Sequence, residues 1–243
     1  MTALDDAVAD ARRRHDRLGW FAAMYRQTTS TVRAQVAAGG FDDAPRMEEF
    51  VTRFAGRYLG PLGGGTVPRC WQVAFDAARS RHHVILQHLL LGINAHINLD
   101  LAVVAAEVCP GERIPFLHDD FMRVNAVLAA LMPKVRGCIG RFSPLLDVID
   151  RVGGGGDDEV LRFSIRVARD EAWQQAVTLA STADDARRAQ LIDSLDRHVA
   201  VLGKLVAHPG GLLQRAVDVV AATESDDVVA VIDALGRVTL DSP

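Results

Sequence analysis

Residues 84 to 106 read VILQHLLLGINAHINLDLAVVAA, and this stretch is the most apolar part of the 243-residue chain. It is long enough to span a bilayer, but it is interrupted by polar side chains at Gln87, His88, Asn94, His96, Asn98 and Asp100. Polar groups at that density are too costly in lipid. The stretch therefore predicts a buried core helix, at about residues 82 to 108, and no membrane partner.

The sequence on either side of this stretch predicts further helices. Strand signals are scarce, aromatic residues make up only 6% of the chain, and helical periodicity with capping residues recurs. We expect helices at residues 3–38 (one helix, or two that break near Gly19), 46–59, 68–80, 119–131 (ended or kinked by Pro133), 158–181, 184–207, 212–222 and 226–236. The predicted fold is an all-α, single-domain helical bundle over residues 1–243, in which residues 210–243 form a C-terminal helical extension.

The amino-acid composition limits the kinds of partner and the cellular compartment that we expect for the protein. The net charge of −4 and the absence of a basic run beyond Arg12–Arg14 argue against nucleic acid, which needs a basic face. The cysteines are few and far apart, at positions 70, 109 and 138, so neither a disulfide framework nor a cysteine zinc site is expected. The acidic N-terminus lacks the pattern of a signal peptide. We therefore expect a cytoplasmic protein.

The polar residues of the central helix fall on two stripes. At about 100° per residue, residues four apart follow one another along the same side of a helix. Because an unpaired buried polar group costs roughly 2–7 kcal/mol, these residues must find partners. Gly92 leaves a gap in the side-chain layer, with room for a ligand, a water or a neighbouring helix. The first stripe is His88, Gly92, His96 and Asp100, and the second is Gln87, Asn94 and Asn98.

His96 and Asp100 are the leading catalytic candidates. Their i,i+4 spacing allows an imidazole nitrogen and a carboxylate oxygen to share one metal ion, or an aspartate to orient a histidine that acts as a general base. Asn94 and Asn98 are the accompanying candidates for holding substrate or water. A third interpretation, a purely structural network that locks neighbouring helices, stays equally open.

Other segments offer partners for this pair. Asp120 and His88 are candidates to complete the ligand set of a divalent metal, zinc or iron, because five of the eight histidines lie between residues 82 and 118. The alternative for residues 118–120 is that Asp119 caps a helix while Asp120 is solvated. Arg169, on a later helix with Arg166, either pairs with Asp100 or binds an anionic substrate group. Trp173 and Asn125 are further candidates for binding substrate.

The segment Gly92-Ile-Asn-Ala-His-Ile-Asn-Leu-Asp-Leu101 resembles the most distinctive motif of an uncharacterised bacterial family, the domain of unknown function 5995. The resemblance extends to about residue 205. It implies a helical fold, and its motif contains the candidate site residues Asn94, His96, Asn98 and Asp100. A fainter similarity links the His-x-x-x-Asp spacing to helical zinc-dependent phospholipases and nucleases, whose further His and Glu pairs are missing here. Looser matches to the family are Trp20-Phe21, Tyr25, Phe54-Ala55, Tyr58, Trp71, Arg79, Arg123-Val-Asn125, Arg169 and Ala172-Trp173.

Three functional hypotheses follow. The first is a metal-dependent helical enzyme that hydrolyses an ester or phosphoester of a small lipophilic substrate. The second is a non-catalytic module that binds a small apolar ligand or a partner protein. The third is a metal-free cyclase or isomerase in which His96 is the acid or base. A small-molecule ligand or substrate is the expected partner, and a homo-oligomer is compatible with the sequence.

Overall fold

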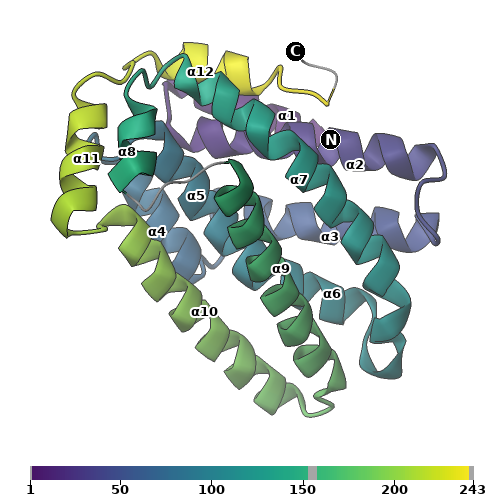
Figure 1. Cartoon of the computed structure of the whole chain (residues 1–243). Coiled ribbons are helices and arrows are strands. Elements are labelled where there is room, and N and C mark those ends of the chain that lie inside the picture. Colours follow the sequence, from purple (N-terminus) through teal and green to yellow (C-terminus); the bar gives the residue numbers. More distant parts are fainter. Residues whose placement is uncertain (1, 153–157, 241–243) are drawn as a thin grey trace.

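The computed structural model of the protein describes residues 2–152 and 158–240, except the side chains of residues 125, 150–151 and 158–167. All regular structure in these residues is helical, as predicted (Figure 1). The elements are α1 (Thr2–Arg14), α2 (Leu18–Ala37), α3 (Ala44–Leu62), α4 (Arg69–Ala78), α5 (Ile85–Ala95), η1 (His96–Leu101), α6 (Ala102–Val108), η2 (Gly111–Leu117), α7 (His118–Gly140), α8 (Leu146–Val152), α9 (Asp158–Ser181), α10 (Asp185–Ala207), α11 (Gly211–Ala221) and α12 (Val228–Leu235).

The central helix consists of α5, η1 and α6 in direct succession, and it is buried as predicted. Its start is fixed by two side chains: the Gln87 Oε1 accepts from the Val84 amide at 3.1 Å, and the Glu224 carboxylate accepts from the Ile85 amide at 2.8 Å. The helix from Ile85 to Val108 is long and apolar enough to cross a membrane, but 78% of its most apolar window is buried inside the protein. This burial is what a core helix of a folded domain shows.

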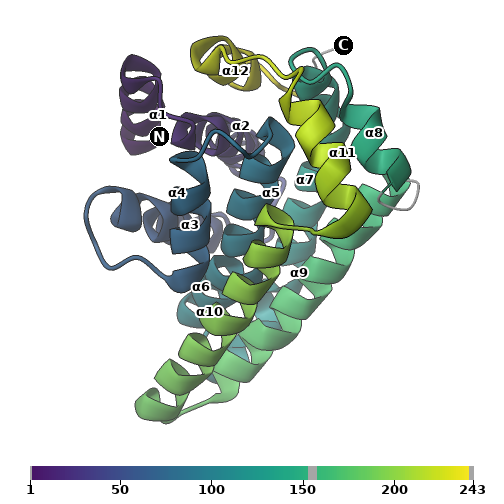
Figure 2. The ribbon, with the colours of Figure 1, turned by 90° about the vertical axis from the view of Figure 1, so that its left-hand side faces the viewer.

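The other helices surround the central one. On one side, α10 packs against α4 and α5, while α9 packs against η1 and α6. The antiparallel pair of α9 and α10 projects at the lower end of the molecule in Figure 2. On the other side, α2 contacts α5 and α3 contacts η1 and α6. The turn of the chain that carries His96 and Asp100 therefore lies between α3 and α9.

The structure refines two predicted helix boundaries. The first helical segment is two helices, as one of the two predictions had it, and the break lies at residues 15–17, just before Gly19, where His15 has φ 52°. Gly19 lies inside α2, where its missing side chain allows close packing, since a Cβ there would meet Ile232 Cδ1 at 2.5 Å. Likewise, α7 continues through Pro133 to Gly140, because burial of Leu131 and Val135 offsets the hydrogen bond that proline removes.

The C-terminal helices are bonded into the same core. Helix α11 packs against α8, and α12 packs against α2, α7 and α1. The indole Nε1 of Trp20 donates to the Val228 carbonyl at 3.2 Å, and the Ser225 amide donates to the Phe142 carbonyl at 2.8 Å. The described chain thus forms one domain, in which the C-terminal segment covers the outer faces of α2 and α8.

Candidate functional site

The two polar stripes of the central helix have different neighbours. Gln87 and Asn94, from the second stripe, both reach α10: the Gln87 amide donates to the Val206 carbonyl at 2.8 Å, and the Asn94 amide donates to the Val199 carbonyl at 2.9 Å. The Asn98 side-chain amide in turn donates to the side-chain Oδ1 of Asn94 at 2.9 Å. This stripe attaches α10 to the central helix, and it is not directed at the cavity described below.

The first stripe faces α2, α3 and α4. The gap that Gly92 leaves is occupied by the ring of Phe21, because a Cβ on Gly92 would lie 2.2 Å from Phe21 Cδ2. Of the three occupants that the sequence left open, a neighbouring helix is the one found. His88 packs its ring edge-on to Trp20, with the ring centroids 4.9 Å apart. The remaining pair of this stripe is His96 and Asp100.

Asp100 is fully buried, with 0% of its surface exposed, and its carboxylate contacts three donors from the described side chains. Arg57 Nε donates to Oδ1 at 3.1 Å, while Trp71 Nε1 at 2.8 Å and His96 Nδ1 at 3.1 Å both lie against Oδ2. Arg57, the arginine that pairs with Asp100, comes from α3, and no ion pair of Asp100 with Arg169 is found among the described side chains. The side chain of Arg166 lies outside the described residues. A carboxylate with this set of donors holds its charge in the core because it is both paired and hydrogen-bonded.

The helix changes its winding at the same place. Residues His96–Leu101 form a π-helical turn between the α-helical segments α5 and α6. Such turns are rare, and they occur frequently at functional sites because they displace side chains from their regular α-helical directions. A regular α-helix was predicted throughout this stretch, so the π-helical turn was not expected. The i,i+4 contact of His96 with Asp100 nevertheless forms within it.

His96 is held by aromatic rings as well as by Asp100. Phe54 stacks on the imidazole with ring centroids 3.6 Å apart, and Tyr25 packs edge-on at 4.4 Å. The side chain is 3% exposed, and this burial lowers the pKa of His96, an effect that the hydrogen bond to Asp100 only partly opposes. The imidazole is therefore neutral at neutral pH. With the Nδ1 proton on the side of Asp100, Nε2 is left as a hydrogen-bond acceptor.

His96 is one of the residues that line an apolar cavity of about 60 Å³. Its Nε2 is buried and has no hydrogen-bond partner within the described part of the protein. A single water needs about 10–15 Å³ of such space, so the cavity has room for a small molecule. The cavity is lined by Phe21, Met24, Tyr25, Thr28, Thr29, Val32, Phe50, Val51, Phe54, Ile93, His96, Ile97, Val124, Leu128, Met132 and Arg169.

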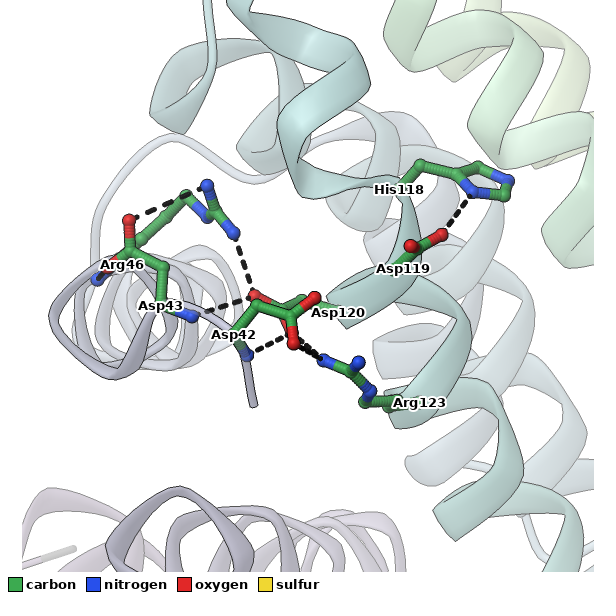
Figure 3. A network of polar contacts seen from close by, with 7 residues as sticks. All are labelled: Asp42, Asp43, Arg46, His118, Asp119, Asp120 and Arg123. Atoms are coloured by element: carbon green, nitrogen blue, oxygen red, sulfur yellow. Dashed lines mark hydrogen bonds and ion pairs between the residues drawn. The ribbon is translucent and has the colours of Figure 1, made fainter. Parts of the chain in front are cut away.

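Asp120, predicted as a metal ligand, lies in a separate network (Figure 3). Its carboxylate accepts from the Asp42 and Asp43 amides at 2.8 and 3.3 Å, and from Arg46 and Arg123 at 2.8 and 2.6 Å. Burial tends to raise the pKa of Asp120, but these donors outweigh it and the pKa lies below its usual value. Asp120 is thus engaged in fixing the turn between α2 and α3 to the start of α7.

The alternative predicted for residues 118–120, in which Asp119 caps a helix and Asp120 is solvated, is also wrong. Asp120 is fully buried and not solvated, and helix α7 has no side-chain cap at its start. Asp119 is exposed and contacts the neighbouring His118 instead, pointing away from the Asp120 network in Figure 3. The burial of Asp120 arises because the turn at residues 42 and 43 closes over it.

The remaining predicted residues do not gather at His96. Trp173 packs on His118 and Phe121, with ring centroids 5.0 Å apart in both cases, and it does not line the cavity. Asn125 belongs to α7, but its side chain lies outside the described residues. Within the described residues, no group of three or more His, Cys, Asp or Glu side chains is placed to hold a metal ion. The predicted set of His88, His96, Asp100 and Asp120 is therefore not brought together.

Sequence reasoning missed several residues that make the site. Arg57 gave no signal, because it lies on an amphipathic helix whose charged residues are expected at the surface. Trp71 and Tyr25 were noted only as matches to the family, yet Trp71 donates to Asp100 and Tyr25 lines the cavity. The available signal was a polar handle on each of these aromatic residues, since a buried tryptophan N–H or tyrosine O–H needs a partner.

The chain also matches a known protein family. Residues 1–209 match the model of a family described as one of unknown function, DUF5995. The chain has no significant similarity to any curated protein or to any solved structure. The match includes the central helix and the elements that surround His96, from α2 to α10. This protein therefore belongs to the family of unknown function DUF5995.

Proposed function

We propose that the protein binds a small, largely apolar molecule in the cavity beside His96, and that His96 acts on this molecule as a general base without a metal ion. The supporting observation is that His96 lines the cavity while its buried Nε2 has no partner within the described residues. Leaving such an acceptor unsatisfied costs about 1–3 kcal/mol. A ligand that brings an O–H or an acidic C–H to Nε2 offsets that cost.

The surroundings of His96 suit proton transfer. Asp100 accepts at Nδ1, which fixes the tautomer and leaves the lone pair on Nε2 directed away from the carboxylate. When Nε2 takes a proton from the ligand, the imidazolium is stabilised by the neighbouring Asp100 carboxylate, which is paired with Arg57. The proton returns from Nε2 to another atom of the ligand, and the result is an isomerisation or a ring closure.

The size of the cavity limits the ligand. A volume of about 60 Å³ admits only a small molecule unless side chains move. Met24 and Met132 are in the wall, and their unbranched, flexible side chains can adjust to a larger guest. The proposed ligand is therefore a compact molecule with an apolar body and one group that faces His96.

Metal-dependent hydrolysis receives less support from this arrangement. Nδ1 of His96 faces Asp100, and both oxygens of Asp100 already accept hydrogen bonds. Asp120 is held by two arginines in another part of the fold. That leaves Nε2 as the nitrogen of His96 without a partner among the described residues. A single histidine nitrogen is a poor metal site, because zinc in proteins takes three or four protein ligands.

The test uses butan-2-one, a small ketone with acidic C–H groups, in D2O. Exchange of its protons for deuterium is followed by proton NMR with the wild type, with His96→Gln and with His88→Gln. His88 is the matched control, since it is also a buried histidine with an unpartnered Nε2, on the same stripe, but does not line the cavity. We expect faster exchange with the wild type and with His88→Gln than with His96→Gln. Equal rates for the wild type and His96→Gln contradict the role of a base.

The non-catalytic alternative makes a different prediction in the same experiment. If the cavity only binds ligands, butan-2-one shifts the ¹⁵N resonance of His96 Nε2, while the exchange rate is the same for all three proteins. If the ketone produces neither the shift nor the exchange, the cavity is not the ligand site. The small, almost entirely apolar wall is the observation that favours this alternative.

A further inference from the structure

Tyr25 lies beside His96 in the cavity wall. The two rings pack edge to face with their centroids 4.4 Å apart, and both residues line the cavity. Tyr25 is only 5% exposed, and its buried hydroxyl makes no hydrogen bond of good geometry among the described residues. A buried tyrosine hydroxyl usually has a partner, because leaving a buried polar group unsatisfied is costly. Tyr25 thus brings a second polar group to the small apolar space beside His96.

The Tyr25 hydroxyl is suited to donate a hydrogen bond. Burial raises the pKa of Tyr25 well above its usual value, so the phenol keeps its proton at neutral pH. The Thr29 side chain, one turn further along α2, partly opposes this rise through a hydrogen bond. A neighbour that lowers the pKa of a phenol in this way donates to the phenol oxygen. Thr29 therefore occupies an acceptor position of the hydroxyl, and the proton of Tyr25 is left to be donated.

Other polar side chains of the described wall already interact within the protein. The Thr28 hydroxyl donates to the Met24 carbonyl at 3.2 Å, and Arg169 has an interaction of its own. The polar features that a ligand meets are then a donor at Tyr25 and an acceptor at Nε2 of His96. Because the two rings are in contact and the cavity is small, the matching groups of the ligand must be close together.

We propose that the ligand is a small apolar ketone, whose carbonyl oxygen accepts a hydrogen bond from Tyr25 while His96 removes a proton from the carbon next to the carbonyl. This inference rests on the function proposed above, and it specifies the substrate class and a second catalytic residue. A carbonyl group makes the C–H bond beside it acidic, so one compact functional group meets both polar requirements of the wall. The apolar residues of the wall contact the hydrocarbon part.

The proposed step balances without a further reactant. The C–H bond breaks, its proton moves to Nε2 of His96, and its electron pair passes to the carbonyl oxygen, which gives an enolate. Tyr25 keeps its proton and stabilises the new negative charge through its hydrogen bond. When the ketone also has a β,γ double bond, the imidazolium returns the proton to the γ carbon. The product is the conjugated isomer, and nothing is oxidised or reduced.

The first test extends the exchange experiment with butan-2-one in D2O to Tyr25→Phe and Tyr58→Phe. Tyr25→Phe keeps the ring against His96 and removes only the hydroxyl. Tyr58 is the matched control, since it is also a buried tyrosine next to Phe21 but does not line the cavity. We expect Tyr25→Phe to slow the His96-dependent exchange at least about tenfold, because one donor to a developing oxyanion contributes roughly 10²–10³ in rate. Tyr58→Phe should keep the exchange of the wild type.

The second test reports on the hydrogen bond itself. Infrared spectroscopy of butan-2-one with a ¹³C-labelled carbonyl measures the carbonyl stretch of the bound ketone. A hydrogen bond from Tyr25 lowers this frequency, so the wild type and Tyr58→Phe should show a lower frequency than Tyr25→Phe. A loss of packing alone would not produce this difference. If Tyr25→Phe fails to fold, the wild-type spectrum decides, since a bound carbonyl at the frequency found in an apolar solvent contradicts the hydrogen bond.

The two proposals fail separately. Exchange that depends on His96 but is equally fast in Tyr25→Phe, or a carbonyl frequency that is the same in Tyr25→Phe and the wild type, overturns the role of Tyr25 and leaves the proposed function standing. Exchange that does not depend on His96, together with a carbonyl shift that depends on Tyr25, removes the general base but keeps the ketone as the ligand class. If butan-2-one does not bind at all, both proposals fail.

Discussion

At the level of single residues, Asp100 connects three helical segments through one carboxylate. Its donors are Trp71 from α4, Arg57 from α3 and His96 from the same helical turn. The same carboxylate thus fixes the tautomer of His96 and joins the packing of α3 and α4 to the central helix. Its two effects, on stability and on the proton of His96, are separable by experiment.

We expect Asp100→Asn to lower the free energy of unfolding by about 3 kcal/mol, because it removes the negative charge that compensates Arg57 in the core. The variant should also shift the proton of His96 from Nδ1 towards Nε2, since the acceptor at Nδ1 is weakened. Urea denaturation measures the first effect, and ¹⁵N NMR of the imidazole measures the second.

The control for this variant is Asp196→Asn. Asp196 is also a buried aspartate, but it accepts from the backbone amides of Arg69 and Cys70 at the start of α4. It should lose stability without any change in the tautomer of His96. An unchanged His96 spectrum in Asp100→Asn argues against the orienting role of Asp100.

Some contacts of His96 and Asp100 were predictable from the sequence, and others were not. The pairing of His96 with Asp100 was predictable, because two polar residues four apart on an apolar helix lie side by side and both need partners. The partner of Asp100 was not, because Arg57 lies 43 positions away and only the packing of α3 brings it there. The metal set failed for a similar reason: Asp120 is bound by arginines and amides of a distant turn.

At the level of elements, the close approach of α2 to the central helix depends on Gly92. The ring of Phe21 fills the place where a side chain on Gly92 would be, and the same ring packs edge-on to Tyr58, Trp71 and His96. The two helices therefore meet through an aromatic cluster that also forms part of the cavity wall. A change at Gly92 is transmitted to the site through Phe21.

We expect Gly92→Ala to destabilise the protein by about 1–3 kcal/mol, although alanine favours helices by ~1 kcal/mol over glycine. The reason is that the new Cβ would lie 2.2–2.8 Å from three ring atoms of Phe21. The matched control is Gly56→Ala, in the interior of α3, where a Cβ meets nothing within 4 Å. That substitution should be neutral or stabilising in thermal denaturation. Equal effects of the two substitutions would show that Phe21 moves aside freely.

At the level of the whole molecule, the core contains histidines that are neutral when the protein is folded. Burial lowers the pKa of His88 to about 3, with a smaller contribution from the neighbouring charges of His83 and Arg17. Burial likewise lowers the pKa of His96. In the unfolded chain these side chains have pKa values near 6.5, so the unfolded state takes up protons before the folded state does. Lowering the pH therefore favours unfolding, because these buried histidines take up protons once the protein unfolds.

The pH dependence of stability should reveal this directly. As the pH falls from about 6.5 towards 3, His88 contributes a loss of about 1.4 kcal/mol per pH unit to the free energy of unfolding. In His88→Gln this part of the slope disappears, while substitution of the exposed His82 leaves the slope as it is. Urea denaturation at a series of pH values measures both. A slope that is identical in the wild type and His88→Gln would mean that His88 is protonated in the folded protein.

The helices themselves were easier to predict than the long-range contacts that pack them together. Periodicity and caps predicted the all-α fold and a buried central helix, since these are local properties of the chain. The packing of α12 against α1 and α2, which brings residues more than 200 positions apart into contact through Trp20 and Val228, has no local signal. The cavity belongs to this second class, because its wall combines side chains from α2, α3, α5, α7 and α9 with His96 and Ile97 of η1.

The π-helical turn at His96–Leu101 has a consequence for the phase of the central helix. A turn closed by i→i+5 hydrogen bonds contains one residue more than an α-helical turn, and one residue corresponds to about 100° of rotation. The helix thus behaves as two α-helical halves that are out of phase by one residue, with the site at their junction. Deleting one residue from this junction would restore a regular helix, but it would rotate α6 relative to α5. The apolar side chains of α6 that face α3 and α9 would then turn away from them, so the geometry around His96 and the packing of α6 can only change together.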